Sequence, residues 1–283
     1  MQELHADGGA MKKRILLLKN KYESTLIWVI GFLLIWEAGA FLIEHTKRSP
    51  ENVLPHIYQI IESVFRTEFV NGSQTIFQIV LSNTGTTLVR AVLGYLIGAF
   101  VGYLLALLMN LFRPLEKMIF PYLMLIQMIP ILGMAPIVLA ITKDIDKSRI
   151  VIAAILTFYP VATNTLAGLR AVEPQRKELM HSYAASQFEI YRKLLIPSSM
   201  PYLFTGLKIS APMAITASIL VDTLQGGGGL GCILSQSLKH ATSIYIFWQI
   251  VLLSAFVGIG SYYGISLLEK LFTPSNRKKG GAK

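Results

Sequence analysis

Long apolar stretches free of charged residues dominate the pattern of hydrophobic and polar positions along this chain. Uncharged runs of 22, 25 and 20 residues cover 91–112, 118–142 and 150–169. A helix needs about 20 apolar residues to cross a bilayer, so each run predicts a membrane-spanning helix. Three similar segments, with at most two charges each, cover 24–43, about 204–224 and about 245–268. The pattern therefore predicts an all-α, polytopic membrane protein with six transmembrane helices.

Lysine and arginine are distributed unevenly over the predicted loops, and this bias predicts the orientation. With the N-terminus inside, the inner segments hold 17 basic residues and the outer segments hold seven. Because basic residues are retained on the cytoplasmic side, we expect both termini in the cytoplasm. The expected organisation is a cytoplasmic tail at 1–23, a first transmembrane helix at 24–43, an external amphipathic segment at 44–84, a transmembrane core at 85–272 with a cytoplasmic loop at 170–201, and a basic cytoplasmic tail at 273–283.

Composition supports this class and excludes others. Hydrophobic residues make up 53% of the chain and charged residues only 15%, whereas soluble domains carry about a quarter charged residues. The net charge of +10 is spread over loops and tails rather than over a basic face, so no nucleic-acid partner is expected. The single cysteine, Cys232, excludes an internal disulfide and any multi-cysteine metal site.

Two features near the first and fifth predicted spans have alternative interpretations. Ala38-Gly39-Ala40 resembles a signal-peptide cleavage site, but the apolar segment is longer than a signal core of about 7–15 residues, so we expect an uncleaved anchor. Glu37 and Asp222 lie towards the outer ends of their spans, where each is expected to reach water or a partner.

Small residues and prolines give the spans distinct roles. Gly94, Gly98, Gly102 and Ala106 recur at every fourth position and predict a face for close helix packing. Prolines at 121, 130 and 136 predict kinks in the third span, and broken helices at membrane depth are typical of a translocation pathway.

The pathway candidates are polar or kink-forming side chains near these prolines: Gln127, Pro130, Tyr159 and Asn164. The alternative for Gln127 and Asn164 is an interhelical hydrogen bond. The run from Gly226 to Gly231 contains G-x-G-x-x-G, but it follows a membrane helix, so a flexible outer hinge is favoured over a dinucleotide site.

The loop at 170–201 carries local signals for two short helices. Pro174 suits the first turn of one helix. Ser186 and Glu189 form a capping box that begins the other helix, and Pro197 is expected to end it. Phe188, Tyr191 and Leu195 share one face of the second helix, which could pack on its own bundle or bind a soluble partner.

The segment from Glu178 to Pro197 resembles the signature loop of permease subunits of ATP-binding-cassette (ABC) importers. That signature reads E-A-A, three residues, G, nine residues, then I-x-L-P, and Glu178 and Ala184 take the places of its acid and its glycine. The departures are Leu179 and Met180 for the two alanines, Ala184 for glycine, and an exchange of Leu194 and Ile196. If the turn needs a positive φ, alanine there costs about 1 kcal/mol.

The resemblance covers roughly residues 50–272 and is similar to the nitrate, sulfonate and taurine branch, which includes permeases for thiamine-precursor pyrimidines and riboflavin. It rests further on Val53-Leu54-Pro55, Ile129-Pro130 with Pro136, Phe158-Tyr159-Pro160 and Gly229-Leu230-Gly231.

The resemblance implies a type I ABC importer-like transmembrane domain that moves a small polar organic solute or anion by alternating access. Its implied partners are two ABC ATPase subunits, a second permease copy in a homodimer, an external solute-binding protein and the bilayer, in the cell membrane of a prokaryote. The implied ATPase-coupling residues are Glu178, Ala184, Ala185, Ser186, Phe188, Tyr191, Leu194, Ile196 and Pro197.

The sequence offers no catalytic or metal-binding constellation and no phosphate-binding G-x-x-x-x-G-K-[ST] motif. No cofactor is therefore expected on this chain, and ATP is expected to be used by partner subunits. The alternative functions are a stand-alone secondary transporter or channel, against which the missing inverted halves argue, and a membrane enzyme.

Overall fold

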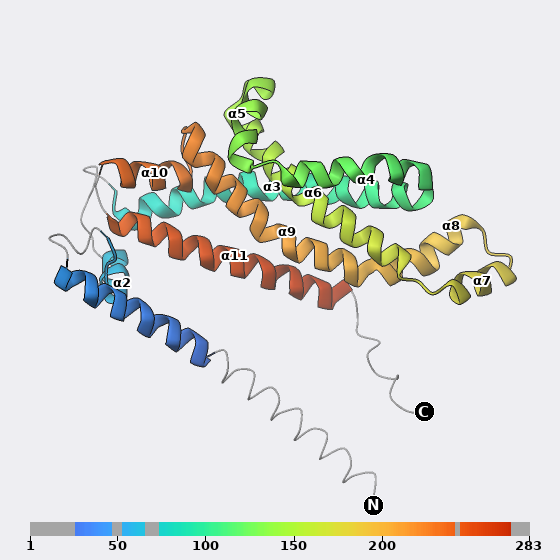
Figure 1. Ribbon diagram of the computed structural model, residues 1–283, viewed down its shortest axis with the longest axis horizontal. Coiled ribbons are helices and arrows are strands. Elements are labelled where there is room, and N and C mark those ends of the chain that lie inside the picture. Colours follow the sequence, from blue (N-terminus) through green and yellow to red (C-terminus); the bar gives the residue numbers. More distant parts are fainter. Residues whose placement is uncertain (1–25, 47–52, 66–73, 241–243, 273–283) are drawn as a thin grey trace, which may run out of the picture. The chain divides into compact units, whose positions relative to one another are not determined.

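The computed structural model describes residues 26–46, 53–65, 74–240 and 244–272, and this part of the chain is nearly all helical (Figure 1). The expected tails at 1–23 and 273–283 lie outside the described residues. Internal contacts divide the chain into two units, one of Met1–Thr67 with Ser243–Tyr245 and one of Glu68–Thr242 with Ile246–Lys283.

The first unit places a charged pair beside an apolar helix. The helix Leu26–Thr46 is followed by α2, Ile57–Phe65. Glu37 accepts a hydrogen bond from the backbone N–H of Ile57 at 2.9 Å and lies 2.6 Å from Nδ1 of His56. The hydrogen bond to Glu37 raises the pKa of His56. Of the two environments expected for Glu37, water or a partner, the structure shows a partner within the same chain.

The second unit contains the remaining helices. Their bounds are α3 Ile76–Leu111, α4 Arg113–Met128, α5 Ile131–Thr142, α6 Ile145–Arg170, α7 Pro174–Ser182, α8 Gln187–Ile190, the π-helix η2 Tyr191–Leu195, α9 Ile196–Gln225, α10 Leu230–His240 and α11 Ile244–Phe272. Among the described residues, five helices are long and apolar enough to span a membrane, and a sixth span results if α4 and α5 are counted as one broken span. The predicted number of spans is therefore confirmed.

Helices α3, α6 and α9 form the centre of the second unit, and glycines set their spacing. A Cβ at Gly98 would lie 2.7 Å from the side chain of Thr157, and one at Gly206 would lie 2.7 Å from the carbonyl oxygen of Pro160. Gly94, Gly98, Gly102 and Ala106 are all buried on α3, and the three glycines face α6. The predicted packing face is confirmed.

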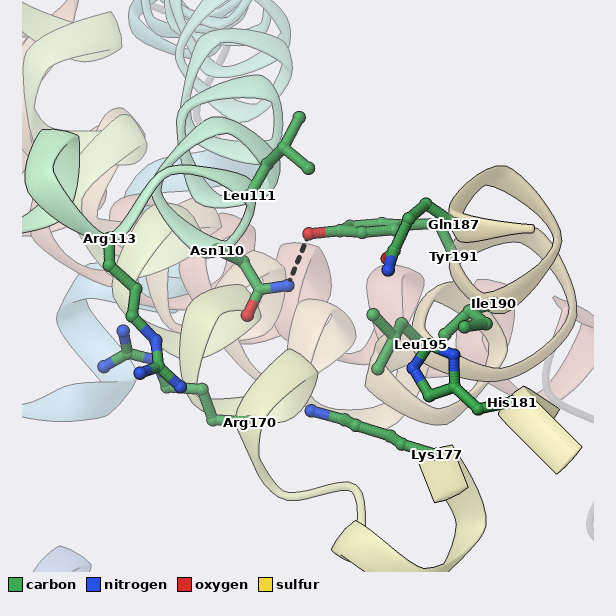
Figure 2. A pocket seen from close by; sticks show the side chains of 10 residues that line it. All are labelled: Asn110, Leu111, Arg113, Arg170, Lys177, His181, Gln187, Ile190, Tyr191 and Leu195. Atoms are coloured by element: carbon green, nitrogen blue, oxygen red, sulfur yellow. Dashed lines mark hydrogen bonds between the residues drawn. The ribbon is translucent and has the colours of Figure 1, made fainter. Parts of the chain in front are cut away.

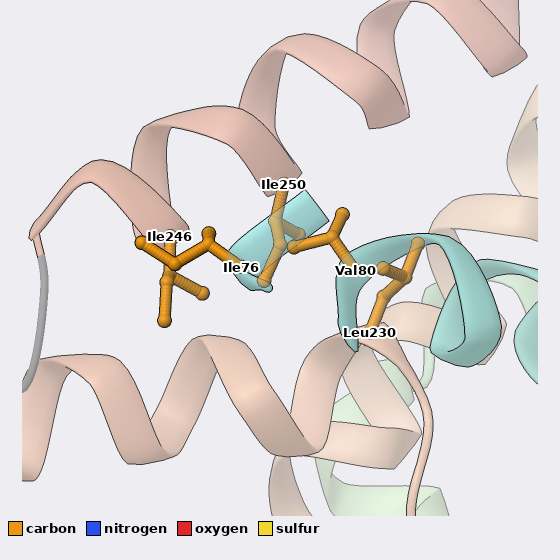
Figure 3. Packing of buried hydrophobic residues seen from close by; sticks show 5 residues of the cluster. All are labelled: Ile76, Val80, Leu230, Ile246 and Ile250. Atoms are coloured by element: carbon orange, nitrogen blue, oxygen red, sulfur yellow. The ribbon is translucent and has the colours of Figure 1, made fainter. Parts of the chain in front are cut away.

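Apolar clusters close the two ends of this unit. Ile76 and Val80 of α3 meet Leu230 of α10 and Ile246 and Ile250 of α11 at one end (Figure 3). The clusters at the opposite end lie where α3 and α6 finish, close to α7 and α8. Each end of the unit therefore has its own apolar cluster.

The third predicted span is interrupted at one of its three prolines. The axes of α4 and α5 differ by 108° at Ile129 and Pro130. Ile129 has extended backbone angles, as the residue before a proline prefers. Pro121 and Pro136 lie inside α4 and α5, which continue through them. Only Pro130, whose preceding residue has extended backbone angles, interrupts the helix.

Helix α3 begins earlier than the expected core boundary at residue 85. Thr75 caps its first turn by accepting from the N–H of Gln78 at 3.4 Å, and the Gln78 side chain accepts from the N–H of Thr75 at 3.1 Å. This reciprocal capping box satisfies two free backbone donors and starts the helix at Ile76. The first turns of α3 thus belong to the stretch expected to be an external segment.

Candidate functional site

The loop between α6 and α9 is built as two short helices joined at a sharp corner. Pro174 occupies the first turn of α7, where its missing N–H costs nothing. Ser186 accepts from the N–H of Glu189 at 3.3 Å, and the Glu189 carboxylate accepts from the N–H of Ser186 at 3.1 Å. Lys193 adds an ion pair to Glu189 at 2.8 Å. The predicted starts of both helices are confirmed.

The corner is a Schellman motif centred on Ala184. Its φ is 54°, in the left-handed region that disfavours a side chain. The N–H of Ala184 donates to the carbonyl of His181 at 2.8 Å, and the N–H of Ala185 donates to the carbonyl of Met180 at 3.0 Å. This geometry explains why the signature that Glu178–Pro197 resembles carries glycine at this position.

The inner face of the loop is fixed to the bundle by an apolar cluster and one hydrogen bond. Leu169 and Val172 pack with Ile190 and Leu195, all of them buried. Met180, Ala185, Tyr191 and Leu194 pack against this cluster. The Asn110 side chain at the end of α3 donates to the Tyr191 hydroxyl at 2.7 Å (Figure 2). The loop is therefore attached to the ends of α3 and α6.

The outer face of the loop leaves large side chains uncovered. Leu179 is 57% exposed, Tyr183 79% and Phe188 72%, all close to the corner. Phe188 thus separates from Tyr191 and Leu195, with which it was predicted to share one face. Glu178 and Ser186 are exposed beside these residues.

The prediction that Pro197 ends the second helix is wrong. The chain stays helical from α8 through η2 and along α9 to Gln225. The N–H of Ile196 donates to the carbonyl of Tyr191, a π-type bond that shifts the hydrogen-bond register immediately before the proline. Pro197 then falls in the first turn of α9, where its missing donor is tolerated. One continuous helical path thus joins the loop to a membrane-spanning helix.

A basic cavity of about 540 Å³ lies between this loop and the ends of α3, α4 and α6 (Figure 2). Its charged lining residues are Arg113 of α4, Arg170 of α6, and Lys177 and His181 of α7. Arg170 also pairs with Glu116 of α4.

The pathway candidates are not gathered into one site. Gln127 and Pro130 are exposed at the broken end of α4. Tyr159 is half-buried and packs against the cluster around Ala106 and Leu166. Asn164 donates to the carbonyl of Pro160 at 2.8 Å, within its own helix. The hydrogen bond of the Asn164 side chain is therefore made within α6, to the carbonyl of Pro160 itself, and not to another helix.

Sequence reasoning missed a buried charge cluster at the end of the unit opposite the loop. Asp222 of α9 and Arg149 of α6 are both fully buried, and Oδ1 of Asp222 lies 2.7 Å from Nε of Arg149, an ion pair without a well-directed hydrogen bond. Arg90 of α3 lies 3.7 Å from the same oxygen and 2.9 Å from Asp146. Thr87 donates to Asp222 at 2.8 Å. Asp222 therefore does not reach water, because α3 and α6 supply its partners.

The glycine run beside this cluster is a packed turn, so the flexible-hinge prediction does not describe its structure. Gly226, Gly227, Gly228 and Gly229 all have positive φ. The carbonyls of Gly226 and Gly228 accept from Arg149, and a Cβ at Gly229 would lie 2.7 Å from Cγ of Asp222. Glycine is required here by backbone conformation and by space.

Comparison with known proteins adds independent findings. The family described as binding-protein-dependent transport system inner membrane component matches residues 94–274. The chain is 28% identical over 265 residues to the formylaminopyrimidine transport permease protein of Halalkalibacterium halodurans, covering 93% of this chain and 100% of that protein. It is 28% identical over 203 residues to the nitrate import permease protein of Synechococcus elongatus, covering 71% of each.

The fold also matches solved structures. An inward-facing structure of the MetNI methionine ABC transporter aligns with a TM-score of 0.63 at 18% identity, covering 71% of this chain and 99% of that chain. This likeness confirms the all-α, type I importer-like fold. Within the described ranges, no group of three or more His, Cys, Asp or Glu side chains could hold a metal ion. The chain belongs to the family of binding-protein-dependent transport system inner membrane components, and it is a permease subunit of an ABC importer.

Proposed function

We propose that ATPase subunits dock on the exposed corner of the α7–α8 loop and drive solute translocation by alternating access. The carrying observation is the continuous helical path from α8 through η2 into α9. The exposed Leu179, Tyr183 and Phe188 supply an apolar contact surface, while Ala185 and Tyr191 hold the loop to the bundle. A displacement of the corner is then passed to α9 as a rigid-body motion.

Copurification tests this docking role. Phe188→Ser should reduce the amount of ATPase subunit recovered with the permease while leaving membrane insertion intact, because a central apolar contact is lost. Arg192→Ser, on the exposed side of η2, is the matched control and should retain the ATPase. Equal recovery with both variants would refute the docking role of the corner.

We propose further that the transporter contains two copies of this chain, two ATPase subunits and an external solute-binding protein, with the solute path between the permease copies. The exposed Gln127 in the uncharged second half of α4, next to the 108° break, supports a water-filled path there. In a Cys232→Ser background, Gln127→Cys should react with a small water-soluble maleimide, whereas Leu125→Cys, in the same uncharged half of α4, should react much more slowly. Equal rates would place Gln127 outside the path.

The proposed cargo is a small polar organic solute or anion, in line with the names of the relatives. Uptake into liposomes should require the ATPase subunits, ATP and the solute-binding protein. The compound that copurifies with that binding protein identifies the solute. Flux through this chain alone under an ion gradient would instead favour a stand-alone transporter or channel.

A further inference from the structure

The basic cavity behind the α7–α8 loop has an excess of positive charge that the described residues do not neutralise. Arg113, Arg170, Lys177 and His181 line it, and no carboxylate side chain does. Glu116 pairs with Arg170, but among the described residues neither Arg113 nor Lys177 forms an ion pair. Arg113 and Lys177 therefore line the same cavity without an ion-pair partner among the described residues.

The cavity also presents neutral hydrogen-bonding groups next to these cations. Lys177 and His181 are four residues apart on α7 and so lie on one face of that helix. Asn110, Gln187 and Tyr191 add amide and hydroxyl groups to the lining. Figure 2 shows Lys177 extending from α7 towards the side of the cavity where Arg113 and Arg170 lie. Three separate segments of the chain thus direct donors into one volume of about 540 Å³.

We propose that this cavity binds a phosphate group. Arginine donors match phosphate oxygens in pairs, lysine supplies a point charge, and the neutral donors complete the shell. Two sources carry this chemistry: the headgroup of an anionic phospholipid, or a soluble phosphate compound. This assignment rests on the proposed function: if ATPase subunits dock on the loop, the loop lies in the cytoplasm, and the lipid would come from the cytoplasmic leaflet. The bound group joins α7 to the ends of α4 and α6, so it stiffens the attachment of the ATPase-docking loop.

Direct binding measurements on the full chain, purified in a neutral detergent, test the proposal. One arm titrates inorganic phosphate against sodium chloride of equal ionic strength. The other titrates dioctanoyl phosphatidylglycerol against dioctanoyl phosphatidylcholine. The double variant Arg113→Gln/Lys177→Gln should weaken binding of the active probe by about tenfold for each cation removed. Arg176→Gln, the exposed neighbour of Lys177 on α7, is the matched control and should bind like the wild-type chain.

The outcomes distinguish a soluble phosphate from an anionic lipid and show which results would overturn the proposal. Binding of inorganic phosphate assigns the site to soluble phosphates, and binding of phosphatidylglycerol without inorganic phosphate assigns it to lipid. No binding of either probe, or equal loss in Arg176→Gln, would overturn the proposal. It would also be overturned if ATPase subunits abolish binding of both probes and are themselves lost from the double variant, because the cations then contact the ATPase. Recovery of the ATPase with the wild-type chain is measured separately. A failure of the proposed ATPase docking can therefore be told apart from a failure of phosphate binding.

Discussion

At the scale of single residues, the backbone angle of Ala184 is the clearest link between sequence and coupling. A left-handed φ of 54° strains an alanine but not a glycine. Ala184→Gly should therefore raise the free energy of unfolding by about 1 kcal/mol or less and preserve transport. Thermal unfolding of the purified chain measures the change. Ala185 lies next to Ala184 and has no positive φ, so Ala185→Gly is the control and should leave the stability unchanged or lower it. If Ala185→Gly stabilised the chain while Ala184→Gly did not, the argument for a strained turn would be refuted.

Ala184→Trp tests the same corner through transport. The turn leads directly into the capped start of α8, so a bulky side chain at a left-handed position should displace the loop and uncouple ATP hydrolysis from uptake. Measuring both rates in proteoliposomes distinguishes uncoupling from loss of the complex. Normal uptake by this variant would contradict a close-packed corner.

The buried pair of Asp222 and Arg149 makes a second residue-scale prediction. Asp222→Asn leaves Arg149 without its fully buried counter-charge, which should cost about 3–5 kcal/mol of unfolding free energy. The double variant Asp222→Asn/Arg149→Gln should lose less than the sum of the two single changes, because the charges are coupled. Denaturant unfolding of the purified chain gives all three values.

An exposed pair serves as the control for this cycle. Glu173 and Arg176 lie 3.2 Å apart, and both side chains are more than 60% exposed. Exposed pairs contribute at most about 1 kcal/mol, so Glu173→Gln should change stability little. A coupling energy at Asp222 and Arg149 no larger than that of the exposed pair would show that the buried contact is not stabilising.

At the scale of elements, two glycines of α3 differ in what surrounds them. A Cβ at Gly98 would meet the backbone of Ala154 and the side chain of Thr157, whereas one at Gly85 would meet nothing within 4 Å. Gly98→Ala should therefore destabilise the α3–α6 contact by about 1–3 kcal/mol. Gly85→Ala should stabilise α3 slightly through helix propensity. Thermal unfolding compares the two variants, and equal effects would refute the packing role of Gly98.

The sequence predicted these elements where the controlling interactions are local. Apolar runs identified the spans, the four-residue spacing from Gly94 onwards identified the packing face, and capping residues located α7 and α8. The environment of Asp222 was not predictable, because its partners come from α3 and α6. The continuation through Pro197 was missed as well, since a π-type bond one residue earlier changes what a proline does. Which exposed side chains face the solute cannot be read from one chain, because a partner copy supplies the opposite wall in the proposed assembly.

At the scale of the whole molecule, the function depends on which side of the membrane each end of the second unit faces. Helices α3, α6, α9 and α11 run between two ends, with the α7–α8 loop at one and the charge cluster with α10 at the other. Ser182 lies in α7 and Gln236 in α10, and both are exposed. In a Cys232→Ser background, a membrane-impermeant maleimide should label Gln236→Cys in intact cells and Ser182→Cys only in inside-out vesicles. The physical reason is the basic-residue bias, because a loop that carries Arg176, Lys177, Arg192 and Lys193 is expected to stay in the cytoplasm. Labelling of Ser182→Cys in intact cells would place the docking surface beyond the reach of any ATP-hydrolysing subunit, and the coupling mechanism would then fail however stable the fold.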